Sequence, residues 1–178
     1  MKTERRSLSS VIRTVPDFPK KGIMFRDITT LLKDPEAFRE AVAILCSRYT
    51  DQRIDKVVCV ESRGFILGAA IAVRLNAGFV PIRKKGKLPA ATLRQEYALE
   101  YGTDVIEIHQ DAITPGERVL MHDDLLATGG TISAACKLVE NLGGTIAGLS
   151  FLIELSFLKG RGKLGAYDVF SIIQYDAE

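Results

Sequence analysis

The amino-acid sequence predicts an α/β fold in which a mainly parallel sheet is flanked by helices on both faces. Short apolar runs, which are typical of buried strands, alternate with segments of helical periodicity. The strand-like runs cover residues 56–60, 79–82, 118–122, 146–155 and 169–173, and the helical segments between them include 65–75 and 131–142. Such alternation favours parallel strands joined by helical crossovers. Ligands of these sheets bind at the carboxyl ends of the strands, where the polar loops 61–64, 83–90 and 123–131 are expected.

An earlier helix has a clear start signal at residues 34–36. Asp34 can cap the helix, Pro35 suits its first position, and Glu36 favours the positive end of the helix dipole. Apolar side chains then recur at helical spacing, at Phe38, Val42, Leu45 and Tyr49. The sequence therefore predicts an amphipathic helix that begins at residue 35.

Composition limits the classes of protein to consider. The 178 residues are expected to form a single domain over residues 1–178, because 47% of them are apolar and can fill a core. Lysine and arginine number 24 against 22 acidic residues, so no global positive charge predicts nucleic-acid binding. Cys46, Cys59 and Cys136 lie far apart among apolar residues, which indicates buried, reduced thiols of a cytosolic protein.

The N-terminus gives no targeting signal. Its first 15 residues are polar and lack the apolar centre of a signal peptide. No apolar run in the chain is long enough to cross a bilayer. We therefore expect a cytoplasmic protein with no membrane partner.

The most informative segment is 119–131, an apolar strand that ends in Asp123 and Asp124 and continues into a turn of small residues. That turn, Ala127, Thr128, Gly129, Gly130 and Thr131, has the composition of a phosphate-binding loop. Two glycines let backbone N–H groups approach an anion, the threonines add hydroxyl donors, and the following helix adds its positive dipole. A plain strand-to-helix turn with an aspartate cap is the alternative for the two glycines alone.

Residues 119–131 resemble the signature that binds 5-phosphoribosyl-1-pyrophosphate (PRPP) in type I phosphoribosyltransferases. The resemblance implies a type I core with a small hood, made by the N-terminal segment (about 1–30) and a mobile hairpin loop (about 84–102). It also implies catalytic roles for Asp123 and Asp124, next to the ribose. His122 departs from the family, which usually has an apolar residue there, and we interpret it as a neutral imidazole with satisfied hydrogen bonds rather than as a catalyst.

Two further segments extend the resemblance to pyrophosphate binding. Residues 61–64 follow a predicted strand and resemble the pyrophosphate loop of the family, with Arg63 contacting phosphate oxygens. A basic cluster follows the next strand, and without the resemblance it would be read as a solvated loop. The residues implied to bind pyrophosphate are Glu61, Ser62, Arg63, Arg83, Lys84 and Lys87.

The hairpin and the N-terminal segment resemble the adenine phosphoribosyltransferases in particular. Residues 97–101 and 105–109 are predicted to pair around Gly102, and Leu-Glu-Tyr-Gly at 99–102 implies catalytic roles for Glu100 and Tyr101. Glu100 is the implied general acid or base. The prolines and glycine around residues 15–28 predict a non-helical loop in which Met24, Phe25 and Arg26 are the implied adenine-binding residues. From the residues alone, Phe25 could equally fill a core.

A second glycine motif, at residues 160–165, formally matches G-x-G-x-x-G. The residues after it, 167–173, are typical of a strand rather than a helix, which argues against a dinucleotide site. The sequence therefore predicts only a turn at 160–165.

The function implied by the resemblance is purine salvage. The 5-phosphoribosyl group of PRPP would move to N9 of adenine through an oxocarbenium-like transition state, giving AMP and pyrophosphate. Mg²⁺ is the implied cofactor, bound through PRPP near Asp123 and Asp124 without a direct protein ligand, and family members generally pair as homodimers. Two alternatives stay open: a phosphoribosyltransferase for hypoxanthine, guanine or xanthine, and a PRPP-sensing regulator with the same fold.

Overall fold

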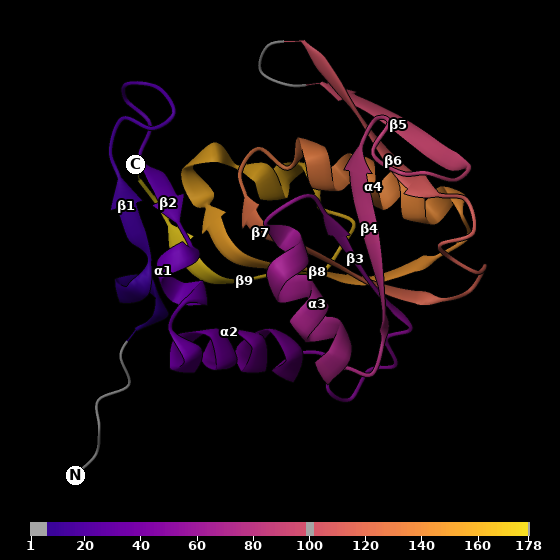
Figure 1. The fold of residues 1–178 in the computed structure, drawn as a ribbon, viewed down its shortest axis with the longest axis horizontal. Helices are drawn as coiled ribbons and strands as arrows, with labels where there is room; N and C mark the ends of the chain where they lie inside the picture. Colours follow the sequence, from indigo (N-terminus) through magenta and orange to yellow (C-terminus); the bar gives the residue numbers. More distant parts are fainter. Residues whose placement is uncertain (1–6, 99–101, 178) are drawn as a thin grey trace.

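The computed structural model describes residues 7–98 and 102–177, and its centre is a seven-stranded sheet in the order β5-β6-β4-β3-β7-β8-β9 (Figure 1). Strands β3, β4, β7, β8 and β9 are mutually parallel, whereas β6 is antiparallel to both β4 and β5. The sheet strands are β3 (Lys56–Val60), β4 (Gly78–Lys84), β5 (Thr92–Ala98), β6 (Thr103–His109), β7 (Arg118–Leu126), β8 (Thr145–Leu155) and β9 (Val169–Tyr175). The prediction of a mainly parallel α/β sheet is confirmed.

Helices cover both faces of this sheet and bury two apolar cores. Helices α2 (Pro35–Ser47) and α3 (Gly64–Arg74) pack on one face, and α4 (Gly130–Asn141) packs on the other. The predicted start of α2 is confirmed, because the Asp34 carboxylate accepts from the backbone N–H groups of Glu36 and Ala37 at 3.0 and 3.1 Å. None of the described helices is long and apolar enough to cross a membrane.

Helix α3 packs against the sheet through two glycines, Gly64 and Gly68, which leave no room for a side chain at either position. A Cβ atom at Gly68 would fall 2.0 Å from the Cys59 Sγ, and one at Gly64 would fall 2.8 Å from an Asp123 carboxylate oxygen. Neither distance is possible unless the helix or the facing side chain shifts. The start of α3 and the end of β7 are therefore in direct contact.

The structure corrects two predicted boundaries in the sheet. Strand β7 runs to Leu126, so Asp123 and Asp124 lie within the strand rather than in the loop that follows it. The reason is that β8 continues to pair with β7, as far as Leu126 opposite Glu154. The hairpin is also longer than predicted, since its first strand begins at Thr92, while residues 99–101 are outside the described part.

The N-terminal segment was expected to be a loop, and the structure instead places a small antiparallel ribbon there. Strand β1 (Arg13–Val15) pairs with β2 (Phe25–Asp27), with Thr14 opposite Arg26. Figure 1 shows this ribbon near the β9 edge of the sheet, opposite the β5–β6 hairpin. The remaining elements are short: η1 (Leu8–Val11), α1 (Thr29–Leu32), η2 (Ser156–Leu158) and η3 (Gly160–Lys163).

Candidate functional site

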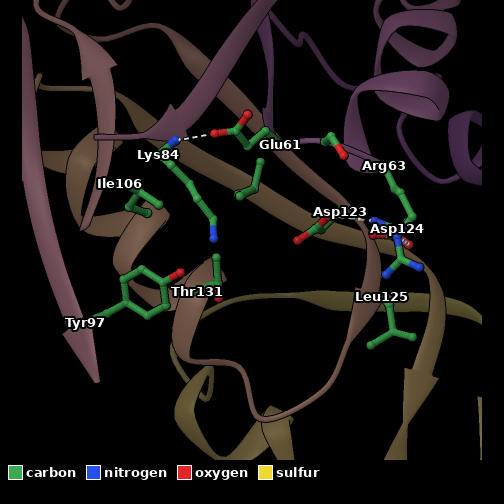
Figure 2. Close-up of a pocket in the computed structure, with 11 residues that line it drawn as sticks. Glu61, Arg63, Lys84, Tyr97, Ile106, Asp123, Asp124, Leu125 and Thr131 are labelled. Atoms are coloured by element: carbon green, nitrogen blue, oxygen red, sulfur yellow. Dashed lines mark hydrogen bonds and ion pairs between the residues drawn. The ribbon is translucent and has the colours of Figure 1, made fainter. Parts of the chain in front are cut away.

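A cavity of about 220 Å³ opens at the carboxyl ends of β3 and β7 (Figure 2). It brings together most of the residues that the sequence predicted for the reacting centre and pyrophosphate. Its lining consists of Val60, Glu61, Ser62, Arg63, Lys84, Tyr97, Ile106, Asp123, Asp124, Leu125 and Thr131. This set combines two cations, three carboxylates and three hydroxyl groups, which is the chemistry of a site for a phosphorylated sugar.

The predicted phosphate loop lines an adjoining cavity of about 80 Å³. Gly129 caps helix α4 with φ of 75°, a left-handed conformation that glycine adopts without strain. The backbone of residues 127–131 and the N-terminus of α4 therefore surround this cavity. Backbone N–H groups at a helix N-terminus stabilise bound anions. All five predicted loop residues lie here: Ala127, Thr128, Gly129, Gly130 and Thr131.

The acid pair is held by burial and by one arginine. Asp123 Oδ1 accepts from the backbone N–H of Asp124 at 2.9 Å. Arg63 Nε lies 2.9 Å from Asp124 Oδ2, close enough for an ion pair although the groups are not aligned as a hydrogen bond. Burial raises the pKa of both carboxyls, and the neighbouring charge of Asp124 raises the pKa of Asp123 further, while Arg63 opposes the shift.

Glu61 organises the loop after β3. One of its carboxylate oxygens accepts from Arg83 Nε and Nη2 at 3.1 and 2.9 Å, and the other accepts from the backbone N–H of Lys84. Burial alone would raise the pKa of Glu61, but these hydrogen bonds outweigh it and hold the pKa below its usual value. The peptide bond between Glu61 and Ser62 is cis.

The predicted cations divide into two groups. Arg63 and Lys84 line the cavity, and Figure 2 shows the Lys84 ammonium pointing into it, while its Nζ lies 3.3 Å from Asp104. Arg83 and Lys87 are not among the lining residues. The Arg83 guanidinium instead binds Glu61 and reaches the Lys87 carbonyl at 3.4 Å.

The residues predicted to bind adenine lie on or beside the N-terminal ribbon, next to Arg63. The Phe25 ring lies 5.1 Å from the Arg63 guanidinium and meets the Phe18 ring edge-on. Met24 is 37% exposed. The Arg26 guanidinium packs over the Tyr175 ring at 4.0 Å and donates to Thr14. None of the three predicted adenine residues lines the two cavities described above.

Tyr97 is a cavity residue that the sequence analysis did not select. It projects from β5 into the cavity, and its hydroxyl lies 3.4 Å from Asp104. Its ring also approaches Gly130 at the start of α4, so the hairpin leans over the phosphate loop. The half-buried alternation of Leu93, Gln95 and Tyr97 along β5 could have identified its inward face. Glu100 and Tyr101 lie outside the described residues.

His122 sits behind the acid pair and is completely buried. Its Nδ1 lies 3.0 Å from the Ser150 hydroxyl, whereas its Nε2 has no hydrogen-bond partner in the described part of the chain. Burial lowers the pKa of the imidazole to about 4, so the ring is neutral at physiological pH. The neutral ring agrees with the interpretation made from the sequence, whereas the expectation that both ring nitrogens are satisfied is not met at Nε2 within the described residues.

Comparison with known proteins identifies the family. The model of the phosphoribosyl transferase domain matches residues 27–177. Adenine phosphoribosyltransferases from Acidobacterium capsulatum and Chloroflexus aurantiacus are both 59% identical, over 94% and 96% of this chain and 93% and 99% of their own lengths.

Solved structures agree with this. The adenine phosphoribosyltransferase of Thermoanaerobacter pseudethanolicus superposes with a TM-score of 0.92 at 54% identity, covering 94% of this chain and 98% of that one. The Saccharomyces cerevisiae enzyme, complexed with an imino-altritol bisphosphate and adenine, gives 0.87 at 40% identity, covering 93% and 96%. Because a family model and close relatives both match nearly the whole chain, the protein belongs to the adenine phosphoribosyltransferase family.

Proposed function

We propose that the protein transfers the 5-phosphoribosyl group of PRPP to N9 of adenine, giving AMP and pyrophosphate. The observation that carries this proposal is that three groups meet at one edge of the sheet: a phosphate loop, an acid pair and a second loop with cations. The choice of adenine follows from relatives named for that base over more than nine-tenths of the chain.

The phosphate loop and the acid pair would hold the phosphoribosyl group. Residues 127–131 bind the 5-phosphate through backbone N–H groups and the threonine hydroxyls, which fixes the orientation of the sugar. Asp123 and Asp124 accept hydrogen bonds from the ribose hydroxyls. As pyrophosphate leaves, positive charge develops on the sugar ring, and carboxylates in a site shielded from water favour that charge. Support comes from the burial of Asp124 and from the position of Asp123, which lines both cavities.

The second loop would receive the leaving pyrophosphate. Arg63 and Lys84 are cations on the cavity wall, and Ser62 adds a hydroxyl donor beside them. Arg83 binds Glu61 and thereby holds the shape of this loop, so we propose that it supports pyrophosphate binding through Glu61. Lys87 is exposed and lies three residues after the end of β4 at Lys84. We therefore keep it as a proposed contact for pyrophosphate.

Magnesium fits this site as a partner of the substrate. No cluster of three or more metal-binding side chains occurs among the described residues, but the cavity is lined by carboxylate oxygens, which Mg²⁺ prefers. We propose that the ion would bind through PRPP, near Asp123 and Asp124 and without a direct protein ligand. The ion would neutralise charge on the pyrophosphate leaving group.

The N-terminal ribbon and the hairpin would close over the base. Phe25 is the proposed stacking partner of adenine, since its ring lies beside Arg63 at the mouth of the acid site. Backbone groups of Met24 and Arg26 would read the edge of the base. Glu100, outside the described residues, is proposed to move the proton at N7 or N9, with Tyr101 in a supporting role.

We also propose that the protein is a homodimer, as the family expectation suggests. Apolar side chains are exposed on α3 and β4, with Val73 at 83%, Ile66 at 45% and Phe79 at 37%. Such a patch favours association with another copy. Light scattering on Val73→Glu should report a monomer where the wild type reports a dimer, and a monomeric wild type at working concentration would reject the proposal.

The base specificity has a direct test. The protein is incubated with PRPP and Mg²⁺ and with adenine, hypoxanthine, guanine or xanthine in turn, and the mononucleotide product is measured. We expect AMP from adenine at a rate far above that of any other product. A higher rate with another purine would show that the protein is a phosphoribosyltransferase for that base. Binding of PRPP without turnover would favour a PRPP-sensing regulator.

A further inference from the structure

The turn η3 (Gly160–Lys163) lies directly against the back of the phosphate loop. Gly160 is buried, and a Cβ atom on it would fall 2.1 Å from the Ala127 carbonyl oxygen and 3.1 Å from the Gly129 nitrogen. In the other direction, a Cβ atom on Gly129 would fall 2.6 Å from the Gly160 carbonyl oxygen. Two stretches of backbone therefore touch with no room for a side chain between them.

A charged fork fixes this turn to the sheet. Arg161 donates from Nε and Nη2 to the two carboxylate oxygens of Glu154, at 2.6 and 2.7 Å. The same guanidinium donates to the Val169 carbonyl at 2.8 Å and to the Ser171 hydroxyl at 3.0 Å. The Glu154 side chain is only 5% exposed, and a two-pronged contact of this kind sets the orientation of both partners.

The fork binds the sheet at Glu154, which lies opposite the residue just before the phosphate loop. Glu154 on β8 is the register partner of Leu126, the last residue of β7 before Ala127. On the other side of the turn, Leu164 is fully buried in the same apolar core as Leu126 and Ile132 of α4. The turn is thus anchored to the strand and the helix that carry the two ends of the loop.

We propose that the 160–163 turn, held by the Arg161–Glu154 fork, is a positioning element for the loop that binds the 5-phosphate of PRPP. The loop cannot rigidify itself, because residues 127–130 carry small side chains and Thr128 is exposed. Backbone donors bind phosphate well only when their directions are fixed beforehand. The inference rests on one part of the proposed function, the binding of the phosphoribosyl group, and does not depend on which base the protein uses.

Two glycine variants of the same turn provide a matched test. Gly160→Ala places a methyl group against the Ala127 carbonyl, whereas a Cβ atom on Gly162 meets nothing within 4 Å. Calorimetric titration with ribose 5-phosphate, and separately with pyrophosphate and Mg²⁺, measures the two anion loops independently. We expect Gly160→Ala to weaken ribose 5-phosphate about tenfold and to leave pyrophosphate nearly unchanged. Gly162→Ala should match the wild type for both ligands.

A second variant keeps the test decisive if Gly160→Ala does not fold. Arg161→Lys retains the positive charge beside Glu154 but loses the fork, and it should weaken ribose 5-phosphate selectively, by a smaller factor. Unchanged ribose 5-phosphate binding in the folded variants, or an equal loss for both anions, would overturn the proposal. Turnover of adenine by the wild type is a separate result, so failure of the proposed base specificity would leave this comparison intact.

Discussion

His122 should make the protein less stable in mild acid, by an amount that its burial sets. In the unfolded chain the imidazole binds a proton near pH 6.5, whereas in the folded chain it does so only near pH 4. Between these values the unfolded state binds more protons, so the free energy of unfolding falls as the pH is lowered through this window. At 1.36 kcal/mol per pKa unit, the loss from pH 8 to pH 5 is about 2 kcal/mol.

The Cys59 thiol beside the imidazole does not change the direction of this pH dependence. Cys59, the register partner of His122 on β3, is buried, and burial raises the pKa of its thiol, so it is uncharged over this range. His122→Ile removes the titrating group and suits a buried strand position. The Ser150 hydroxyl keeps a partner in that variant, because it also lies 3.3 Å from the Met121 carbonyl.

Urea unfolding at pH 8 and pH 5, at fixed protein concentration, measures the effect. All other titrations are common to both proteins, so wild type should lose about 2 kcal/mol more than His122→Ile between the two pH values. Equal losses in wild type and His122→Ile would refute the conclusion that the buried ring is neutral.

Three further predictions concern the site. Asp124→Asn should lower kcat about a hundredfold while the thermal unfolding midpoint changes little, because the substitution removes a carboxylate proposed to face the ribose and keeps the side-chain volume. Phe25→Ala should raise KM for adenine about tenfold, with a much smaller effect on KM for PRPP; equal effects would make Phe25 a core residue. Glu100→Gln should lower the single-turnover rate about a hundredfold and flatten one limb of its pH profile, whereas Tyr101→Phe should keep the shape of that profile. The reverse pattern would exchange the two roles.

The sequence predicted the sheet and its helices because strands appear as short apolar runs and helices as apolar residues at helical spacing, with a cap at the start of α2. Strand β3 was placed at residues 56–60 and observed there, and α2 begins where its aspartate cap and proline predicted. The end of β7 was missed because two aspartates interrupt the apolar run. Hydrogen bonding to β8 keeps that strand extended through them, and such pairing cannot be seen in one segment alone.

The candidate site was predicted in its loops but not in its side-chain pairings. The structure joins Glu61 to Arg83, because β3 and β4 are in register up to Val60 opposite Ile82 and the next residues then meet. The contact between Gly160 and the phosphate loop depends on the path of the chain between β8 and β9. Side-chain partners that are distant in sequence are set by register and packing, which local patterns do not encode.

The glycine-mediated packing of helix α3 against the sheet has a consequence for the stability of this helix on its own. Glycine disfavours a helix by about 1 kcal/mol relative to alanine, and short isolated helices are marginal in water. A free peptide of residues 64–74 should therefore show little helical circular dichroism. We therefore expect the helix to become stable only when strands β3 and β7 are present to pack against Gly64 and Gly68. Its amide hydrogens should then exchange with solvent no more slowly than those of the two strands beneath it.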